Sequence, residues 1–139
     1  MMNEQEAAYH ELCAYTLQNA DARFIHQHVV DAYAAQTATA ATKPIRLVFA
    51  LVGLHLHLEV GKTGREVQLA HMQMARRKRE WPKIALPEAR GLVTAIDVMR
   101  APAGAERERA IDQWCEAVWE AFSGQAGVIA ALVDEYAVR

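Results

Sequence analysis

Apolar residues recur along most of this chain at intervals of three and four positions, which is the spacing of one face of an α-helix. The clearest stripe lies between about residues 105 and 122, and its members are Ile111, Trp114, Val118 and Phe122. Elements that all show helical periodicity must bury their apolar faces against one another. The pattern therefore predicts an all-α fold, a helical bundle of about five to six helices that forms a single domain over residues 1–139.

Residues that favour helix ends divide this pattern into segments. Asn3, Asp21, Thr42 and Ser123 can each accept a hydrogen bond from the first turn of a following helix. The segment from Thr63 to Glu66 fits a capping box, which opens a helix. The predicted helices cover about residues 4–18, 22–36, 44–60, 64–79, 95–100, 105–122 and 124–137.

The stretch from Pro44 to Val60 is apolar on nearly every side, which is typical of a helix at the centre of a bundle. Its last residues, 54–60, alternate strictly between apolar and polar, and this is also the signature of a strand. We prefer a helix because the whole run is too long for an ordinary strand and because Gly61 is a natural helix C-cap.

An irregular, proline-containing loop is predicted at about residues 80–93. This stretch holds two prolines and a glycine, and Trp81 directly precedes a proline, a position that disfavours the helical region. We expect Trp81, Ile84 and Leu86 to anchor the loop to the core. The sequence leaves open whether the loop is a lid over a site.

Composition and charge exclude some classes of partner. The chain has 139 residues, of which 53% are hydrophobic, and a formal net charge of −2. We do not expect a nucleic-acid partner, because proteins that bind nucleic acid usually carry a surplus of basic side chains. The basic run Arg76-Arg77-Lys78-Arg79 is interpreted as a solvated helix end, where positive charge favours the helix dipole.

The compartment is predicted to be the cytoplasm. The first residues lack the apolar stretch of a secretory signal, and the longest apolar run is shorter than the ~20 residues of a membrane span. Cys13 and Cys115 lie far apart and form no CxxC pair, so we expect reduced thiols in the core.

Six histidines, a high number for this length, are the main candidates for chemistry. Side chains three or four positions apart share a helix face, which pairs His55 with Glu59 and His28 with Asp31. Imidazoles and carboxylates from facing helices can bind a divalent metal such as Zn, Fe, Ni or Mn. The candidate metal ligands are His26, Asp31, His55 and Glu59. No HExxH or Glu-x-x-His motif occurs, so ordinary hydrogen bonding and a metal-free acid–base role stay open.

Several of these residues also belong to a family pattern. The segment from His26 to Gln36 resembles the H-x-x-x-V-D-x-Y-A-x-Q core of a bacterial family of unknown function, DUF5946. Leu58-Glu59 followed by Gly61 is similar to the L-E-x-G element of this family, and the blocks at Trp81-Pro82 and 114–122 also fit. The resemblance implies a cytoplasmic helical domain. It favours, as binding residues, His26, Asp31, Tyr33, Gln36 and Glu59.

This chain departs from the family pattern in two respects. The cysteine-rich C-x-x-C head of longer members is absent, so a zinc role for that head cannot be transferred to this chain. Thr37 and Ala50 stand where members often have histidines, so part of a shared metal site would be missing.

Two functions are compatible with these features. The first is a helical binding or interaction module, homodimeric and holding a small-molecule ligand, since the apolar 44–60 helix offers surface for a second copy. The alternative is a metal-dependent enzyme, a hydrolase or transferase acting on a small molecule through His26, Asp31, His55 and Glu59. The sequence does not decide between them.

Overall fold

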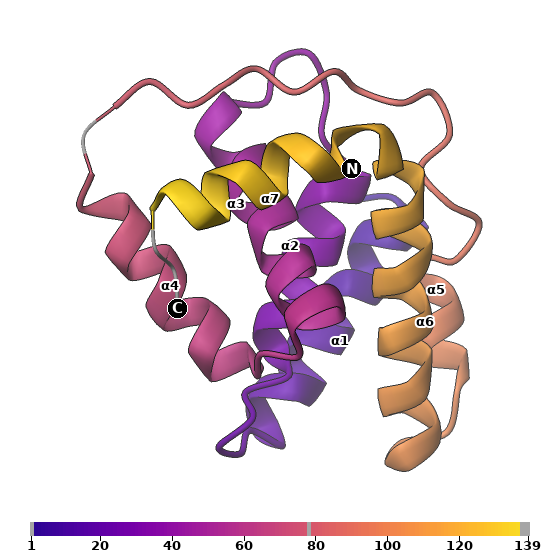
Figure 1. The fold of residues 1–139 in the computed structure, drawn as a ribbon. Coiled ribbons are helices and arrows are strands. Elements are labelled where there is room, and N and C mark those ends of the chain that lie inside the picture. Colours follow the sequence, from indigo (N-terminus) through magenta and orange to yellow (C-terminus); the bar gives the residue numbers. More distant parts are fainter. Residues whose placement is uncertain (1, 78, 137–139) are drawn as a thin grey trace.

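The computed structural model describes residues 2–77 and 79–136, and it confirms the all-α prediction. These residues form seven α-helices, one in each of the seven predicted segments and so more than the bundle of five to six, with one π-helical turn, one 3-10 turn and no strand. The elements are α1 (Glu4–Gln18), α2 (His26–Gln36), α3 (Pro44–His55), η1 (Leu56–Val60), α4 (Gly64–Ala75), α5 (Ala95–Arg100), α6 (Ala105–Ala121), η2 (Ser123–Gln125) and α7 (Ala126–Glu135) (Figure 1).

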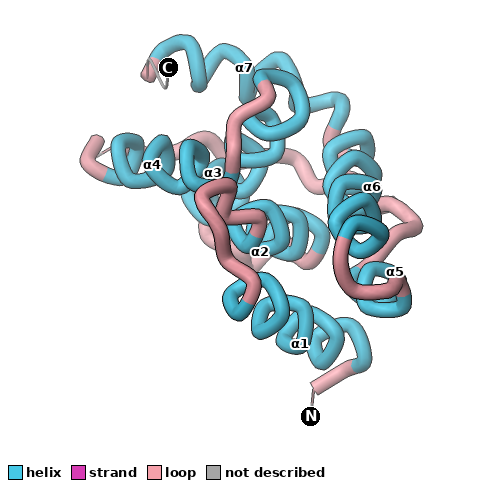
Figure 2. The backbone as a smooth tube through the Cα atoms, turned by 90° about the horizontal axis from the view of Figure 1, so that it is seen from below, coloured by secondary structure: helices cyan, strands magenta, loops and turns pink. Residues whose placement is uncertain are grey.

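Helices α2 and α3 form the centre of the bundle. Helix α2 packs against α3, α1, α4 and α6, and α3 also contacts α7 (Figure 2). Helix α3 is buried along most of its length, as its apolar sequence predicted, whereas α6 buries one stripe that includes Trp114 and Val118. No helix among the described residues has the length and apolar character needed to cross a membrane.

Several helix boundaries follow the predicted caps. Asn3 accepts a hydrogen bond from the Glu6 backbone at the start of α1, and capping boxes open α4 at Thr63 and α5 at Thr94. Gly61, with φ of 83°, lies in the left-handed region and ends the π-helical turn η1. The prediction of helix over 54–60 is thus confirmed, with π geometry at its end.

The predicted start of the second helix at residue 22 is wrong. Phe24 has φ of 51°, in the left-handed region, so the chain can enter α2 only at His26. Asp21 accepts hydrogen bonds from Arg23 instead of capping α2. Likewise Thr42 accepts from the Thr39 backbone, in the turn before α3, and does not cap the helix.

Two further boundaries differ from the sequence prediction. Helix α4 ends at Ala75, before the basic run begins, and Lys78 of that run lies outside the described residues. Ser123 begins a 3-10 turn, so α7 starts at residue 126. In both cases a local turn, and not the apolar stripe, determines where the helix ends or begins.

The proline-containing segment crosses the bundle as an extended strap, here residues 80–93 (Figure 1). Ile84 is buried, and Trp81 and Leu86 are half-buried, as predicted. Arg90 fastens the strap to the end of α2, because its guanidinium donates to the carbonyls of Ala35, Gln36 and Ala38. A cation at this position also favours the helix dipole.

Candidate functional site

Ionisable side chains from four parts of the chain line a cleft of about 250 Å³, which we call the histidine cleft. It lies between the start of α2, the connection from η1 to α4, and one face of α6. Its charged or titratable members are Arg23, His28, His57, Lys62, Glu108 and Asp112, and Ile25, Gly61 and Thr63 complete the lining.

Local backbone geometry holds the Arg23 side of this cleft in place. The Arg23 carbonyl accepts a hydrogen bond of 3.1 Å from the Arg65 N–H in the first turn of α4. The Phe24 carbonyl lies so close to Gly64 that a β-carbon at this glycine would overlap with it. The left-handed Phe24 and the glycine therefore fix the α1–α2 loop against α4, and this loop presents Arg23 to the cleft.

Two stacked histidines form the floor of the cleft. The rings of His28 and His57 lie 3.6 Å apart between centroids and 15° from parallel. His28 is only 4% exposed, and burial, followed by the charge of His57, lowers its pKa to about 3. Its Nδ1 atom has no hydrogen-bond partner among the described residues. His28 is therefore neutral at physiological pH and offers an uncharged ring face to His57.

Asp112 orients the outer histidine. His57 Nε2 donates to Asp112 Oδ1 at 2.9 Å, across 55 positions of sequence. The π-helical turn η1 changes the direction in which residues 56–60 face, and such turns are frequent at functional sites. The pair leaves the other ring nitrogen of His57 and the second oxygen of Asp112 for another partner.

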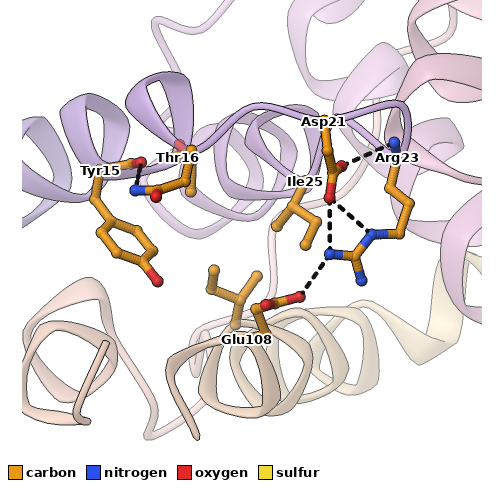
Figure 3. A pocket seen from close by; sticks show the side chains of 8 residues that line it. Tyr15, Thr16, Asp21, Arg23, Ile25 and Glu108 are labelled. Carbon is orange, nitrogen blue, oxygen red and sulfur yellow. Dashed lines mark hydrogen bonds and ion pairs between the residues drawn. The ribbon is translucent and has the colours of Figure 1, made fainter. Parts of the chain in front are cut away.

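A second ion pair closes the other end of the cleft. Arg23 Nη2 lies 3.1 Å from Glu108 Oε1, and these side chains are 58% and 37% exposed. Arg23 is also held by Asp21, which accepts from its Nε and Nη2 and from its backbone N–H. This guanidinium lowers the pKa of the Asp21 carboxyl. Figure 3 shows Arg23 reaching between Asp21 and Glu108.

Behind this ion pair lies a smaller space of about 40 Å³, which we call the Tyr15 hollow (Figure 3). It shares Arg23, Ile25 and Glu108 with the histidine cleft. Its remaining walls are Tyr15, Thr16, Asn19, Asp21 and Ile111. The Arg23–Glu108 pair is therefore the partition between two adjoining spaces.

The five predicted binding residues do not line the histidine cleft. Gln36 is buried and forms four hydrogen bonds: its Oε1 accepts from Gln5 and Trp114, and its Nε2 donates to the carbonyls of Arg90 and Val93. This amide thus joins α2 to α1, α6 and the strap. Tyr33 stacks on Tyr9 with 3.7 Å between ring centroids, and burial raises its pKa.

Asp31 is a buried side chain of the bundle centre. Its Oδ1 accepts from Gln27 Nε2 at 3.1 Å, and its Oδ2 has no partner among the described residues and lies against Gly53 of α3. Complete burial raises the pKa of this carboxyl well above its ordinary value. Asp31 therefore keeps its proton to higher pH than an exposed aspartate does, and its Oδ2 atom fills the space beside Gly53 between α2 and α3.

The predicted metal ligands lie in three environments, of which His55 and Glu59 share one. His26 Nδ1 lies 2.9 Å from the Thr16 hydroxyl, while Glu59 accepts from Trp119 Nε1 and the ring of His55 packs near the same tryptophan. Among residues 2–77 and 79–136, no three histidine, cysteine, aspartate or glutamate side chains are grouped so that they could hold a metal ion. Metal binding by His26, Asp31, His55 and Glu59 has no geometric support here and stays a prediction.

The cysteines are free, as predicted, and lie apart from the cleft lining. Cys115 is buried, its thiol donates to the His28 carbonyl at 3.7 Å, and burial raises its pKa. Cys13 is only partly buried, and burial raises its pKa as well. Neither environment favours the thiolate that nucleophilic chemistry needs.

Sequence reasoning missed the residues that line the histidine cleft. His57 and Asp112 are far apart in sequence, and no motif links them. The available signals were the high histidine count and the alternation at 54–60, which in fact marks the π-helical turn. Arg23, Lys62 and Glu108 carry no signal in the sequence that separates them from ordinary surface charges.

Comparison with known proteins gives one match. A family model described as "Family of unknown function (DUF5946)" matches residues 5–123, which include every residue of the histidine cleft. No curated protein and no solved structure matches this chain.

Proposed function

The chain belongs to the family of unknown function DUF5946, and we propose that it is a binding module for a small zwitterionic molecule held in the histidine cleft. The observation that carries this proposal is the balance of charge in the lining, where two basic and two acidic side chains accompany two histidines. A cleft with this lining matches a ligand that carries both an ammonium and a carboxylate group.

The two signs of charge come from different sides of the cleft. Glu108 and Asp112 lie four residues apart on α6 and so share one face of that helix. Arg23 and Lys62 come from the two loops opposite. An ammonium group would contact the α6 carboxylates, and a carboxylate would contact Arg23 and Lys62.

The existing ion pairs are weak enough for a ligand to replace. Arg23, Glu108 and Asp112 are all more than a third exposed, and exposed ion pairs contribute only about 0–1 kcal/mol. A zwitterion can also exchange partners without loss of charge pairing: its ammonium takes Glu108, and its carboxylate takes the Arg23 nitrogen that Glu108 releases. No charge is left buried and unpaired.

The backbone N–H groups of Thr63, Arg65 and Glu66 at the N-terminus of α4 already have hydrogen-bond partners, so they do not bind the carboxylate of the ligand. At the start of α4 the Arg65 N–H is bonded to the Arg23 carbonyl and the Glu66 N–H to Thr63 Oγ1. The Thr63 N–H is bonded to Glu66 Oε1. Side chains therefore supply the anion-binding groups of the cleft.

Thermal unfolding with added ligand tests this proposal. Glycine, β-alanine and glycine betaine are compared with acetate and with methylammonium, which carry only one of the two charges. A zwitterion should raise Tm as its concentration passes its Kd, because a ligand that binds only the folded state stabilises it. The single-charge compounds should have little effect.

Matched variants separate the cleft from general salt effects. Asp112→Asn and Lys62→Gln should each weaken binding about tenfold or more, the loss of one charge-assisted hydrogen bond. Glu106→Gln on α6 and Lys43→Gln before α3 change the same charges outside the cleft and should leave binding intact. Equal responses of all four variants, or no response to any zwitterion, would refute the proposal.

The other functional predictions are a metal-dependent enzyme, a homodimer and a cytoplasmic location. They rest on the sequence alone, and no contact among the described residues adds support for them. Elemental analysis of untagged protein beside the His26→Ala variant tests the metal, and light scattering tests the dimer.

A further inference from the structure

We infer that the Tyr15 hollow receives the side arm of the ligand and restricts that arm to one or two non-hydrogen atoms. This inference rests on the proposed zwitterion site and adds a selectivity to it. Its starting observation is that the hollow and the histidine cleft share three lining residues, Arg23, Ile25 and Glu108.

The partition between the two spaces has one fixed side and one movable side. Arg23 is fixed by Asp21, which accepts from its backbone N–H and from Nε and Nη2 of its side chain, at 2.9–3.1 Å. Within residues 2–77 and 79–136, the Glu108 carboxylate makes one ion pair, to Arg23 at 3.1 Å. Rotation of the Glu108 carboxylate toward a ligand ammonium would therefore open the hollow while Arg23 stays in place (Figure 3).

The walls of the hollow are rigid because their polar atoms already have partners. The Tyr15 hydroxyl accepts from the Gly104 N–H at 2.9 Å, and the Arg107 guanidinium lies over the tyrosine ring at 4.5 Å from its centroid. The Thr16 hydroxyl donates to the Leu12 carbonyl and also contacts His26. Asn19 donates through its side-chain amide to the Tyr15 carbonyl.

The hollow therefore favours a small apolar arm. Ile25 and Ile111 supply aliphatic surface, and Ile111 is only 1% exposed, so this wall belongs to the core and cannot retreat into solvent. The space of about 40 Å³ exceeds the roughly 10–15 Å³ that a cavity needs to hold one water molecule, and it is far smaller than the roughly 150 Å³ of a cavity that binds benzene. It accommodates a methyl or hydroxymethyl group and excludes a branched or aromatic one.

A series of free amino acids with growing side chains tests this restriction. The probes are glycine, alanine, 2-aminobutyrate, valine and phenylalanine, titrated into the full chain by calorimetry. We expect alanine to bind at least as well as glycine, and valine and phenylalanine to bind about tenfold more weakly or worse. A single methylene in a close-fitting pocket can change affinity by roughly that factor.

The variant Ile111→Val removes one methylene from the wall of the hollow. It should raise the affinity for 2-aminobutyrate relative to the affinity for glycine. The matched control is Ile129→Val, the same change in a buried residue of α7 that does not line the hollow. Circular dichroism confirms that both variants are folded.

The outcomes separate this inference from the proposal on which it rests. If glycine binds but affinity does not depend on side-chain size, or Ile111→Val changes nothing, the inference fails and the zwitterion site stands. If none of the amino acids binds, the zwitterion site itself fails. A size limit that moves with Ile111→Val and not with Ile129→Val supports both.

Discussion

The side chain of Asp31 on α2 lies against Gly53 on α3, and its Oδ2 atom occupies the space that a side chain at Gly53 would need. A β-carbon added to Gly53 would overlap with Asp31 Oδ2 and also press on Val67 of α4. Glycine is required at this position because there is no room for a side chain. Its backbone conformation, which is helical, would itself accept one. The contact couples a residue that the family pattern singled out to the packing of three helices.

Gly53→Ala is therefore expected to destabilise the protein by at least 1–3 kcal/mol, the usual cost of overpacking a core. Urea denaturation followed by circular dichroism measures the change. Gly127→Ala is the control, because a β-carbon there meets nothing within 4 Å and alanine favours helix by up to about 1 kcal/mol. A stable Gly53→Ala protein would mean that α2 and α3 can move apart without loss.

The buried Asp31 carboxyl gives stability a specific pH dependence. Its pKa is raised in the folded state, so the folded protein keeps this proton to higher pH than the unfolded chain, whose pKa is near 3.8. The stability that the group contributes is present below that value and is lost as pH rises through the folded pKa. Asp31→Asn should remove this loss, so the variant gains stability relative to the wild type as pH rises above about 4. Parallel curves for the two proteins in urea denaturation, with exposed Asp134→Asn as the control, would contradict this interpretation.

His28 should produce the opposite slope. Its folded pKa of about 3 lies below the unfolded value near 6.5, so the unfolded chain binds the proton first as pH falls. Stability is then lost between pH 6.5 and pH 3, by on the order of 2–3 kcal/mol from pH 7 to pH 4.5. The test variant is His28→Gln, which leaves His57 and Asp112, the charged neighbours of the ring, unchanged. It should flatten the dependence of stability on pH between pH 6.5 and pH 3. The same substitution at exposed His10 should not.

Gln36 is predicted to be a structural residue rather than a ligand contact. Gln36→Ala leaves the buried Trp114 N–H without its acceptor and releases two carbonyls of the strap. Leaving buried groups unpaired should destabilise the protein by about 2–4 kcal/mol, and hydrogen exchange around Val93 should become faster. Gln113→Ala, on the exposed side of α6, is the control and should change stability little. Loss of zwitterion binding without loss of stability in Gln36→Ala would instead favour the family-based assignment.

Local signals predicted the parts of the fold that depend on local chemistry. The stripe of Ile111, Trp114 and Val118, the capping box at Thr63 and the C-cap at Gly61 all occur as predicted, because each is determined by residues within a few positions. The start of α2 could not be predicted in this way. A left-handed phenylalanine has no sequence signature, and tertiary contacts with α4 hold it in place.

The candidate site depends almost wholly on such tertiary contacts. The family pattern pointed to α2, and α2 does supply one of the two histidines of the cleft floor, but this is His28 and not a residue of the motif. The polar residues of the motif are hydrogen-bonded or packed inside the bundle, as Gln36 and Asp31 illustrate. Spacing along one helix predicts which side chains share a face, but not which residues of another helix lie opposite.

The attachment of Arg90 to the end of α2 bears on the order in which this chain can fold as it is synthesised. The carbonyls of Ala35, Gln36 and Ala38 receive their guanidinium donor from a residue more than fifty positions later. A nascent chain that has emerged only as far as α4 lacks this side-chain donor at the end of its central helix. Contacts of this separation slow folding, because a long loop must close before they form. The bundle should therefore reach its native state late in synthesis, when the strap has emerged and reached α2.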